Sequence, residues 1–144
     1  MSDFVLIDGD LAIFMPAFGA ALVVVRPGTL AGSGPGTVGG KPICVDGDES
    51  SVEVAGCVYM TSQFTIPGTG TLKISALAGD QKAKVSQTGE KAMLLKGSKF
   101  TAEFQVQAPA QQPPPGPGAP IPDSTSKYSG SGSFATTNTI MQAN

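Results

Sequence analysis

The chain has 144 residues with 19 Gly and 12 Pro, but only 14% charged residues and a formal net charge of -2. This length suits one domain, or one domain with an ordered tail, and a 40% hydrophobic fraction with so little charge argues against disorder. The nine basic residues are scattered, whereas nucleic-acid binding requires clustered Lys and Arg that neutralise phosphates. We therefore predict a folded protein of short strands and tight turns, with no nucleic-acid partner.

The N-terminal region predicts short strands joined by turns. Residues 4–7 and 11–14 are apolar runs separated by Asp8-Gly9-Asp10, a pattern typical of two strands and a turn. Residues 20–25 are crowded with β-branched side chains and are followed by Arg26-Pro27-Gly28, which ends the segment. We therefore expect a buried strand over residues 20–25.

The apolar stretch at residues 11–25 is too short for a membrane helix. Such a helix needs about 20 apolar residues, and here Pro16 and Gly19 interrupt the run. Acidic rather than basic residues precede it, which argues against a secretory signal. We expect no stable membrane insertion and predict instead that a partner protein buries part of the stretch. The candidate interface residues are Phe14, Met15, Phe18 and Leu22.

The glycine-rich residues 30–40 invite comparison with a phosphate-binding loop. That loop requires Gly-Lys-Ser/Thr at the point where a strand enters a helix. Here Gly40-Lys41 is followed by Pro42 and by an apolar strand pattern at residues 43–45. The stretch is therefore predicted to be a surface turn in which glycine permits positive φ angles.

Two cysteines, Cys44 and Cys57, lie on either side of the turn-rich residues 46–50. They could face each other across a hairpin, either as a disulfide or as two buried thiols. Because no secretory signal is expected, the reduced state is favoured. Two cysteines without any histidine are too few for a tetrahedral zinc site.

Strand and turn patterns continue through residue 107. Residues 71–77 and 100–106 alternate polar and apolar side chains, as expected for strands with one face on a core. No segment has a helical period over three turns. Together with the N-terminal strands, the predicted strands are 41–45, 51–54, 58–60, 70–77, 82–86, 92–95 and 99–107.

These elements predict an all-β fold, with a compact, turn-rich domain of short strands, cone-like or sandwich-like, over residues 1–107. Residues 108–123 are proline-rich and predict an extended connector, because proline has no amide hydrogen to donate to a sheet. Residues 124–144 are expected to form a C-terminal hairpin or a segment that wraps the domain. Its expected anchors are Tyr128, Phe134, Ile140 and Met141.

Catalytic and metal-binding patterns are lacking in the sequence. Without histidine, Ser-His-Asp and Cys-His arrangements are impossible. The acidic residues lie in predicted turns, where Asp usually bonds nearby backbone amides, and their spacing does not match a twelve-residue calcium loop. We therefore predict a protein that is not an enzyme and has no cofactor or metal. The acidic turn residues are Asp8, Asp10, Asp46, Asp48 and Glu49.

Two segments carry a resemblance to a known family. Residues 34–45 (GPGTVGGKPICV), completed by the acidic turn at 46–48, follow an order of glycine, short apolar strand and acidic turn. Residues 64–72 (FTIPGTGTL) are a second glycine-rich β pattern. In these features the chain resembles the PAAR-like spike-tip proteins of phage-tail-like contractile injection systems, over about the first two thirds of its length.

The resemblance implies a blunt cone of short strands that caps a trimeric β-helical spike (VgrG-like) and helps to pierce the target envelope. It also implies assembly in the cytoplasm, later residence in an injection particle that can be extracellular, and effector cargo as a further partner. PAAR proteins commonly hold zinc through His and Cys near the apex. This chain departs from that pattern because it has no histidine, so no metal site is carried over.

Two other classes of protein remain open on the sequence alone. One is another small baseplate or fibre-associated protein of a phage-like particle. The other is a β-rich module that binds sugar or peptide. Such modules normally bind their ligand on aromatic side chains, and this chain has only two Tyr and no Trp.

Overall fold

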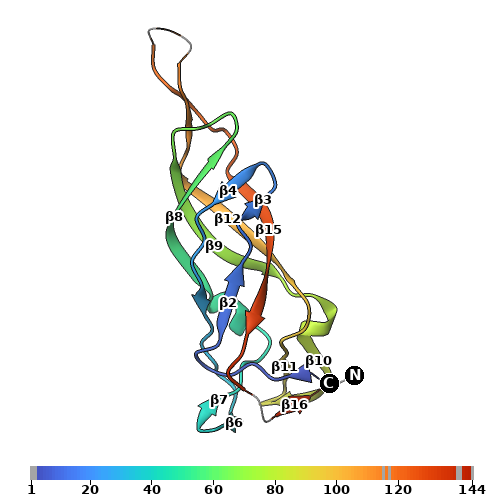
Figure 1. The fold of residues 1–144 in the computed structure, drawn as a ribbon. Coiled ribbons are helices and arrows are strands. Elements are labelled where there is room, and N and C mark those ends of the chain that lie inside the picture. Colours follow the sequence, from blue (N-terminus) through green and yellow to red (C-terminus); the bar gives the residue numbers. More distant parts are fainter. Residues whose placement is uncertain (1–2, 115, 117, 139–140, 144) are drawn as a thin grey trace.

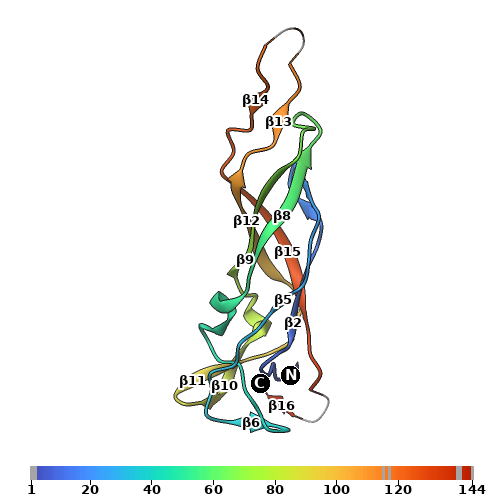
Figure 2. The same cartoon turned by 90° about the vertical axis from the view of Figure 1, so that its left-hand side faces the viewer.

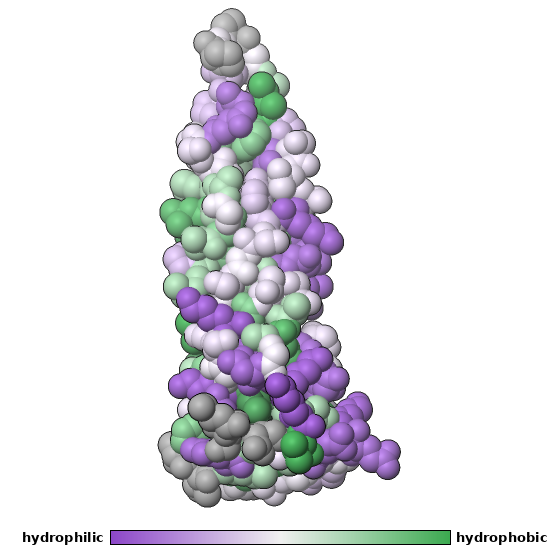
Figure 3. All heavy atoms as spheres, turned by 90° about the vertical axis from the view of Figure 1, so that its right-hand side faces the viewer, coloured by the Kyte–Doolittle hydropathy of each residue, from purple (hydrophilic) through white to green (hydrophobic). Residues whose placement is uncertain are grey.

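The computed structural model describes residues 3–114, 116, 118–138 and 141–143 and shows an elongated body that tapers from a wide end to a narrow end (Figures 1 and 3). Both chain ends lie at the wide end, and a proline-rich hairpin forms the narrow end (Figures 1 and 2). The described part of the chain has no α-helix, and so none that is long and apolar enough to cross a membrane. The predicted all-β fold is confirmed.

Strands and two short 3-10 helices (η1 and η2) make up the regular structure. In chain order the elements of the described residues are β1 (Asp3–Phe4), β2 (Leu11–Phe14), β3 (Ala17–Phe18), β4 (Ala21–Val23), β5 (Gly28–Thr29), β6 (Thr37–Val38), β7 (Lys41–Pro42), η1 (Asp48–Ser51), β8 (Glu53–Thr61), β9 (Gly68–Ala76), η2 (Gly79–Gln81), β10 (Lys82–Thr88), β11 (Lys91–Leu94), β12 (Phe100–Ala108), β13 (Gln111–Gln112), β14 (Ile121–Pro122), β15 (Lys127–Ala135) and β16 (Gln142–Ala143).

One curled antiparallel sheet forms the body. Its strand order is β3-β4-β8-β9-β12-β15-β2-β5, and β3 also lies against β15, while β5 lies against β8. The sheet therefore wraps around a core and presents its other face outward. Four pairs of two short strands, β1–β16, β6–β7, β10–β11 and β13–β14, extend from its two ends (Figures 1 and 2).

Aromatic rings fill the core inside the curled sheet. Phe14 packs edge-on against Phe100, with ring centroids 5.5 Å apart, and Phe104 contacts both Phe18 and Tyr59. All five side chains are buried. Phe14 and Phe18, two of the four predicted interface residues, are thus core residues of this chain.

The expected buried strand at residues 20–25 is buried on one face only. β4 points Ala21 and Val23 into the core, while the neighbouring Leu22 and Val24 are exposed. The predicted buried strand is thus present, and its burial is limited to one face because an antiparallel sheet that curls around a single core leaves its outer face open.

The C-terminal segment is part of the main sheet. β15 lies between β12 and β2 and pairs with both, within the region 124–144 that was expected to form a hairpin or a wrapping segment. Phe134 is buried in the main core and Tyr128 packs against it, while Met141 packs against a smaller apolar cluster. Ile140, the remaining predicted anchor, lies outside the described residues.

Glycines allow the aromatic rings to lie directly on neighbouring strands. A Cβ atom at Gly130 of β15 would lie 2.6 Å from the Phe18 ring, and one at Gly70 of β9 would lie 2.5 Å from the Phe104 ring. Such contacts are shorter than van der Waals packing permits. Glycine is therefore required at the positions where a large ring lies against the backbone of a neighbouring strand.

We expect Gly130→Ala to lower the free energy of unfolding by about 1–3 kcal/mol, because the added methyl group must displace the buried Phe18 ring. Ser129→Ala, at an exposed neighbouring position of β15, is the matched control and should change it by less than about 0.5 kcal/mol. Urea unfolding of both variants measures the difference. Equal stability of the two variants would contradict the close packing of Phe18 on β15.

Candidate functional site

Three segments that are distant in the sequence meet at the wide end of the body. Each has three apolar residues, a polar residue, a glycine with positive φ and a further polar residue. The glycines are Gly9, Gly47 and Gly97, with φ values of 89°, 102° and 56°, a backbone conformation that glycine adopts without steric cost. The three segments are residues 5–10 (VLIDGD), 43–48 (ICVDGD) and 93–98 (MLLKGS).

The middle apolar residues of the three segments form a closed cycle of backbone hydrogen bonds, which we call the backbone ring. The amide of Leu6 donates to the carbonyl of Leu94, the amide of Leu94 donates to Cys44, and the amide of Cys44 donates to Leu6. Each N···O distance is 2.9 Å. Each segment therefore relates to the next in the same way, as in a threefold arrangement.

Two further sets of backbone contacts around the backbone ring also occur three times, once between each pair of segments. Each segment pairs its third apolar residue with the first apolar residue of the next segment. These bridges are Ile7–Ile43, Val45–Met93 and Leu95–Val5. A second set of three hydrogen bonds lies outside these bridges. In each, the amide of the residue that follows one apolar triplet donates to the carbonyl of the residue that precedes the next triplet. Its members are Asp8 to Pro42 (2.8 Å), Asp46 to Ala92 (2.8 Å) and Lys96 to Phe4 (2.9 Å).

A two-stranded unit, called an arm here, leads into each segment. The arms are β6–β7 before residue 43, β10–β11 before residue 93, and β1–β16 before residue 5. Their registers match, because Pro42, Ala92 and Phe4 pair with Thr37, Gln87 and Gln142, respectively. Two arms are ordinary hairpins, whereas the third is assembled from both ends of the chain (Figure 1).

Side chains of the backbone ring alternate between two apolar clusters. Leu6, Cys44 and Leu94 are fully buried and belong to the main core. Five of the six flanking residues belong to a second, smaller cluster: Val5, Ile7, Ile43, Met93 and Leu95. Because successive side chains of a strand point to opposite faces, the second cluster lies on the other face of the ring. The base of the molecule is thus a plate packed on both sides.

Acidic residues at this end stabilise turns. Asp10 Oδ2 accepts a hydrogen bond from the amide of Ile7, and Asp48 Oδ2 accepts the equivalent bond from Val45, both at 2.8 Å. Thr136 and Thr137 also donate to Asp10. Within the described residues no three Cys, Asp or Glu side chains are grouped as metal ligands.

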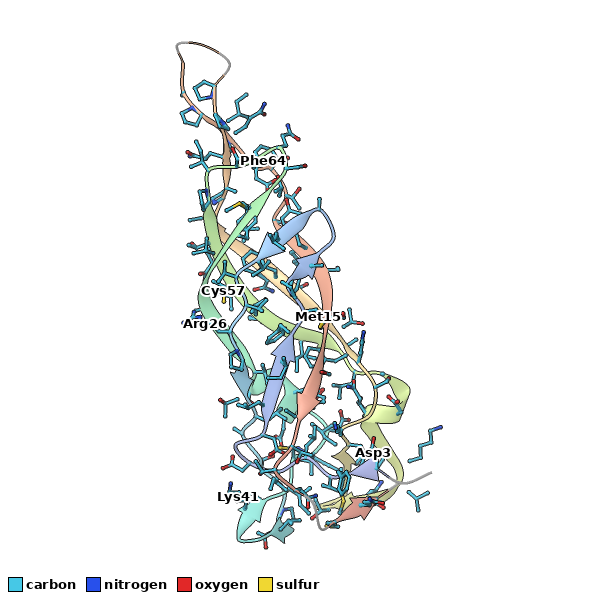
Figure 4. All side chains as sticks on the ribbon, viewed as in Figure 1. Asp3, Met15, Arg26, Lys41, Cys57 and Phe64 are labelled. Atoms are coloured by element: carbon cyan, nitrogen blue, oxygen red, sulfur yellow. The ribbon has the colours of Figure 1, made fainter. Side chains whose placement is uncertain are left out.

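The two cysteines are free thiols in different places. Cys44 lies in the backbone ring, where burial, together with Asp48, Asp10 and Asp8, raises its pKa to about 12. Cys57 is buried on β8, and the guanidinium of Arg26 lies 3.9 Å from its Sγ (Figure 4). Cys44 thus remains a neutral apolar side chain, without the thiolate that nucleophilic or ligand chemistry requires.

At the narrow end, one buried carboxylate joins the proline-rich hairpin to the body. Asp123 follows β14, and its Oδ2 accepts hydrogen bonds from Tyr59 Oη (2.9 Å) and Tyr128 Oη (2.6 Å). The amide of Ala110, on the other side of the hairpin, donates to Tyr59 Oη at 2.9 Å. Residues before and after the hairpin are therefore fixed to β8 and β15.

The pKa values of this network follow from its burial and hydrogen bonds. Burial alone would raise the pKa of Asp123, but bonds donated by Tyr128, Thr125 and Tyr59 outweigh it, so the pKa lies below its usual value. Burial and the Asp123 carboxylate, against the bond from Ala110, raise the pKa of Tyr59 to about 12. At neutral pH the network therefore contains a carboxylate and two neutral phenols.

The structure places the four residues predicted as a partner interface in two different environments. Phe14 and Phe18 are in the core, whereas Met15 and Leu22 are exposed, 43% and 59%, on the outside of the body. The base lies elsewhere, at the wide end that carries Asp3 and Lys41 (Figure 4). One sequence signal for it was present, because Asp-Gly-Asp occurs after an apolar triplet at both 8–10 and 46–48.

The fold and these two ends define an elongated, all-β structural protein with a threefold base and a tapered opposite end. The family model of contractile injection system spike tip proteins matches residues 1–144. The chain therefore belongs to this family and is a structural component of a contractile injection particle. This finding confirms the spike-tip assignment made from residues 34–48 and 64–72. A comparison with curated proteins found no match.

Asp123→Asn tests the network at the narrow end. A carboxyl whose pKa is lowered in the folded state stabilises the protein above its unfolded pKa of about 3.9, and this contribution is lost as the pH falls through the folded value. We expect the variant to be less stable than the wild type by about 1–3 kcal/mol at pH 7. The difference should shrink below about pH 4.

Urea unfolding at pH 7 and pH 3 measures this effect. Glu53→Gln, at an exposed carboxylate on β8, is the control and should show no comparable difference at pH 7. A difference for Asp123→Asn that is the same at both pH values would contradict the assignment of a stabilising carboxylate.

Proposed function

We propose that this spike-tip protein caps a trimeric β-helical spike through its wide end and that its narrow end leads into the target envelope. The single observation that carries the proposal is the backbone ring with its three arms. A single chain that binds on the axis of a threefold partner faces three identical surfaces. Three arms in equivalent positions are what such a partner can contact in the same way three times.

The taper supports this orientation. The base has two apolar clusters, one on each face of the ring, and places three arms side by side. The opposite end narrows to a single hairpin, β13–β14 (Figure 2). A wide, packed base suits a permanent protein contact, whereas a narrow end suits penetration.

Charge reversal on equivalent arm residues tests the docking surface. Lys41 of β7 and Lys91 of β11 are exposed, and they occupy the same position in two arms because they pair with Val38 and Thr88. We expect Lys41→Glu and Lys91→Glu each to weaken capture of the purified spike trimer by about tenfold, or about 1.4 kcal/mol. The double variant should weaken it by about the product of the two effects.

The controls separate the base from the surface first predicted as an interface. Met15→Glu and Leu22→Glu change exposed residues on the side of the body and should leave capture unchanged. The mass of the wild-type complex should correspond to one tip chain per spike trimer. Loss of capture in the Met15 and Leu22 variants, with none in the arm variants, would reverse the assignment; a stoichiometry of three tip chains would also contradict it.

A further inference from the structure

The three arms carry a charged residue at one equivalent position, two residues before each apolar triplet. This residue is Lys41 in β7, Lys91 in β11 and Asp3 in β1. The registers of the arms agree here, because each of the three is directly opposite a residue of the other strand of its arm. Figure 4 shows Lys41 and Asp3 on different arms at the wide end. The backbone is thus threefold at this position, whereas the charge is positive in two arms and negative in the third.

Lys41 and Lys91 lie on the face of the base that is turned away from the main core. Because successive side chains of a strand alternate between faces, Lys41 shares its face with Ile43, and Lys91 shares its face with Met93. Ile43 and Met93 both belong to the second cluster. Val38, directly opposite Lys41, packs against the same cluster. In the proposed function this is the face that meets the spike.

Most carboxylates of the wide end are bound within the chain itself. Asp46 forms an ion pair with Lys82, with Oδ1 3.0 Å from Nζ. Glu90, in the turn between β10 and β11, is the exception among the described residues of this end. The other carboxylates accept hydrogen bonds from backbone amides or hydroxyls; they are Asp3, Asp8, Asp10, Asp48, Glu49 and Asp80. These acidic groups therefore stabilise the fold.

The lysines of the arms are in the opposite situation. Lys41 and Lys91 are exposed, and in the described part of the chain neither forms an ion pair. A lysine ammonium has three donors and no acceptor, so both groups are available to a partner. A chain whose formal net charge is -2 thus turns two unpaired cations toward its proposed partner.

Asp3 differs because the third arm needs an additional bond. The arms of Lys41 and Lys91 are hairpins closed by a turn, whereas β1 and β16 come from opposite ends of the sequence. Asp3 Oδ2 accepts a hydrogen bond from the amide of Gly97, and Oδ1 accepts one from the amide of Phe4, both at 2.8 Å. The bond from Gly97 fixes β1 to the neighbouring segment. The carboxylate therefore stabilises the third arm and offers no cation to the spike.

The symmetry of a trimeric spike relates this charge pattern to the chemistry of the spike. Its three subunits are identical, so equivalent arms meet equivalent groups. Charges across a protein interface are arranged so that opposite signs meet, and like charges oppose binding. Resting on the proposed function, we infer that every spike subunit presents a carboxylate where it meets an arm. Two of these carboxylates pair with Lys41 and Lys91, and the third, opposite Asp3, has no cationic partner at that position.

A carbodiimide tests this inference on the complex of the full chain with the purified spike trimer. The reagent activates a carboxylate, the amine of a contacting lysine attacks it, and an amide bond forms while the reagent leaves as a urea. Peptide mass spectrometry should locate links at Lys41 and Lys91. Both should lead to the same acidic residue of the spike, on two different subunits. In Lys41→Gln the largest product formed through these positions should fall from a tip with two spike subunits to a tip with one.

The salt dependence of capture gives a second measurement. Lys41→Gln and Lys91→Gln should each weaken capture about threefold at about 0.05 M salt, but by less than about 1.5-fold at about 1 M, where the Debye length is only about 3 Å. Lys84→Gln is the matched control and should leave capture unchanged at both. Lys84 is exposed on β10 next to Ala83, which belongs to the second cluster, so Lys84 points to the other face.

Three results would overturn the inference while leaving the docking intact. They are a capped spike with no links at Lys41 and Lys91, a link from Asp3 to a spike lysine, and capture at low salt that the Gln variants tighten or leave unchanged. The proposed function fails differently, when the wild-type chain is not captured at either salt concentration or when three chains bind one trimer. The inference then falls with it.

Discussion

The closed cycle of hydrogen bonds among Leu6, Cys44 and Leu94 is the constraint on which the wide end depends. Each buried amide finds its acceptor on a neighbouring segment, so no two segments satisfy the cycle without the third. An unpaired buried amide costs as much as a lost hydrogen bond, and closing loops of this length costs chain entropy. The apolar clusters on the two faces of the ring offset that cost, and the arms are positioned as a consequence.

The strands with alternating patterns were predictable because their outer and inner faces differ in polarity. Residues 100–106 lie within β12, as expected. β15 (KYSGSGSFA) gave no such signal, since it is mostly Ser and Gly. Its place in the middle of the sheet follows from the rings it must accommodate, because Gly130 and Gly132 lie under Phe18 and Phe100. Such a requirement is visible only when distant residues are brought together.

The candidate site shows the same limit. Hydrophobicity alone does not distinguish a residue that a partner buries from one that its own chain buries, and Phe14 and Phe18 proved to be core residues. The repeated Asp-Gly-Asp marked two segments of the base, but the third carries Lys-Gly-Ser. The arm formed by β1 and β16 pairs residues from opposite ends of the sequence, so no local sequence pattern predicts it.

Under the proposed function, a single chain solves a geometrical problem that a trimer does not. Three identical chains around an axis must bring three copies of every element to that axis, which limits how narrow their end becomes. This chain has threefold contacts at the backbone ring, where a threefold partner would bind. The rest of the body does not repeat them. Its narrow end is one hairpin, with strands about 4.8 Å apart. A buried carboxylate with two tyrosines and the paired backbone hydrogen bonds between Ile66 and Gln111 hold it to the body. The asymmetry of the remaining fold is therefore the condition for a sharp end on a threefold base.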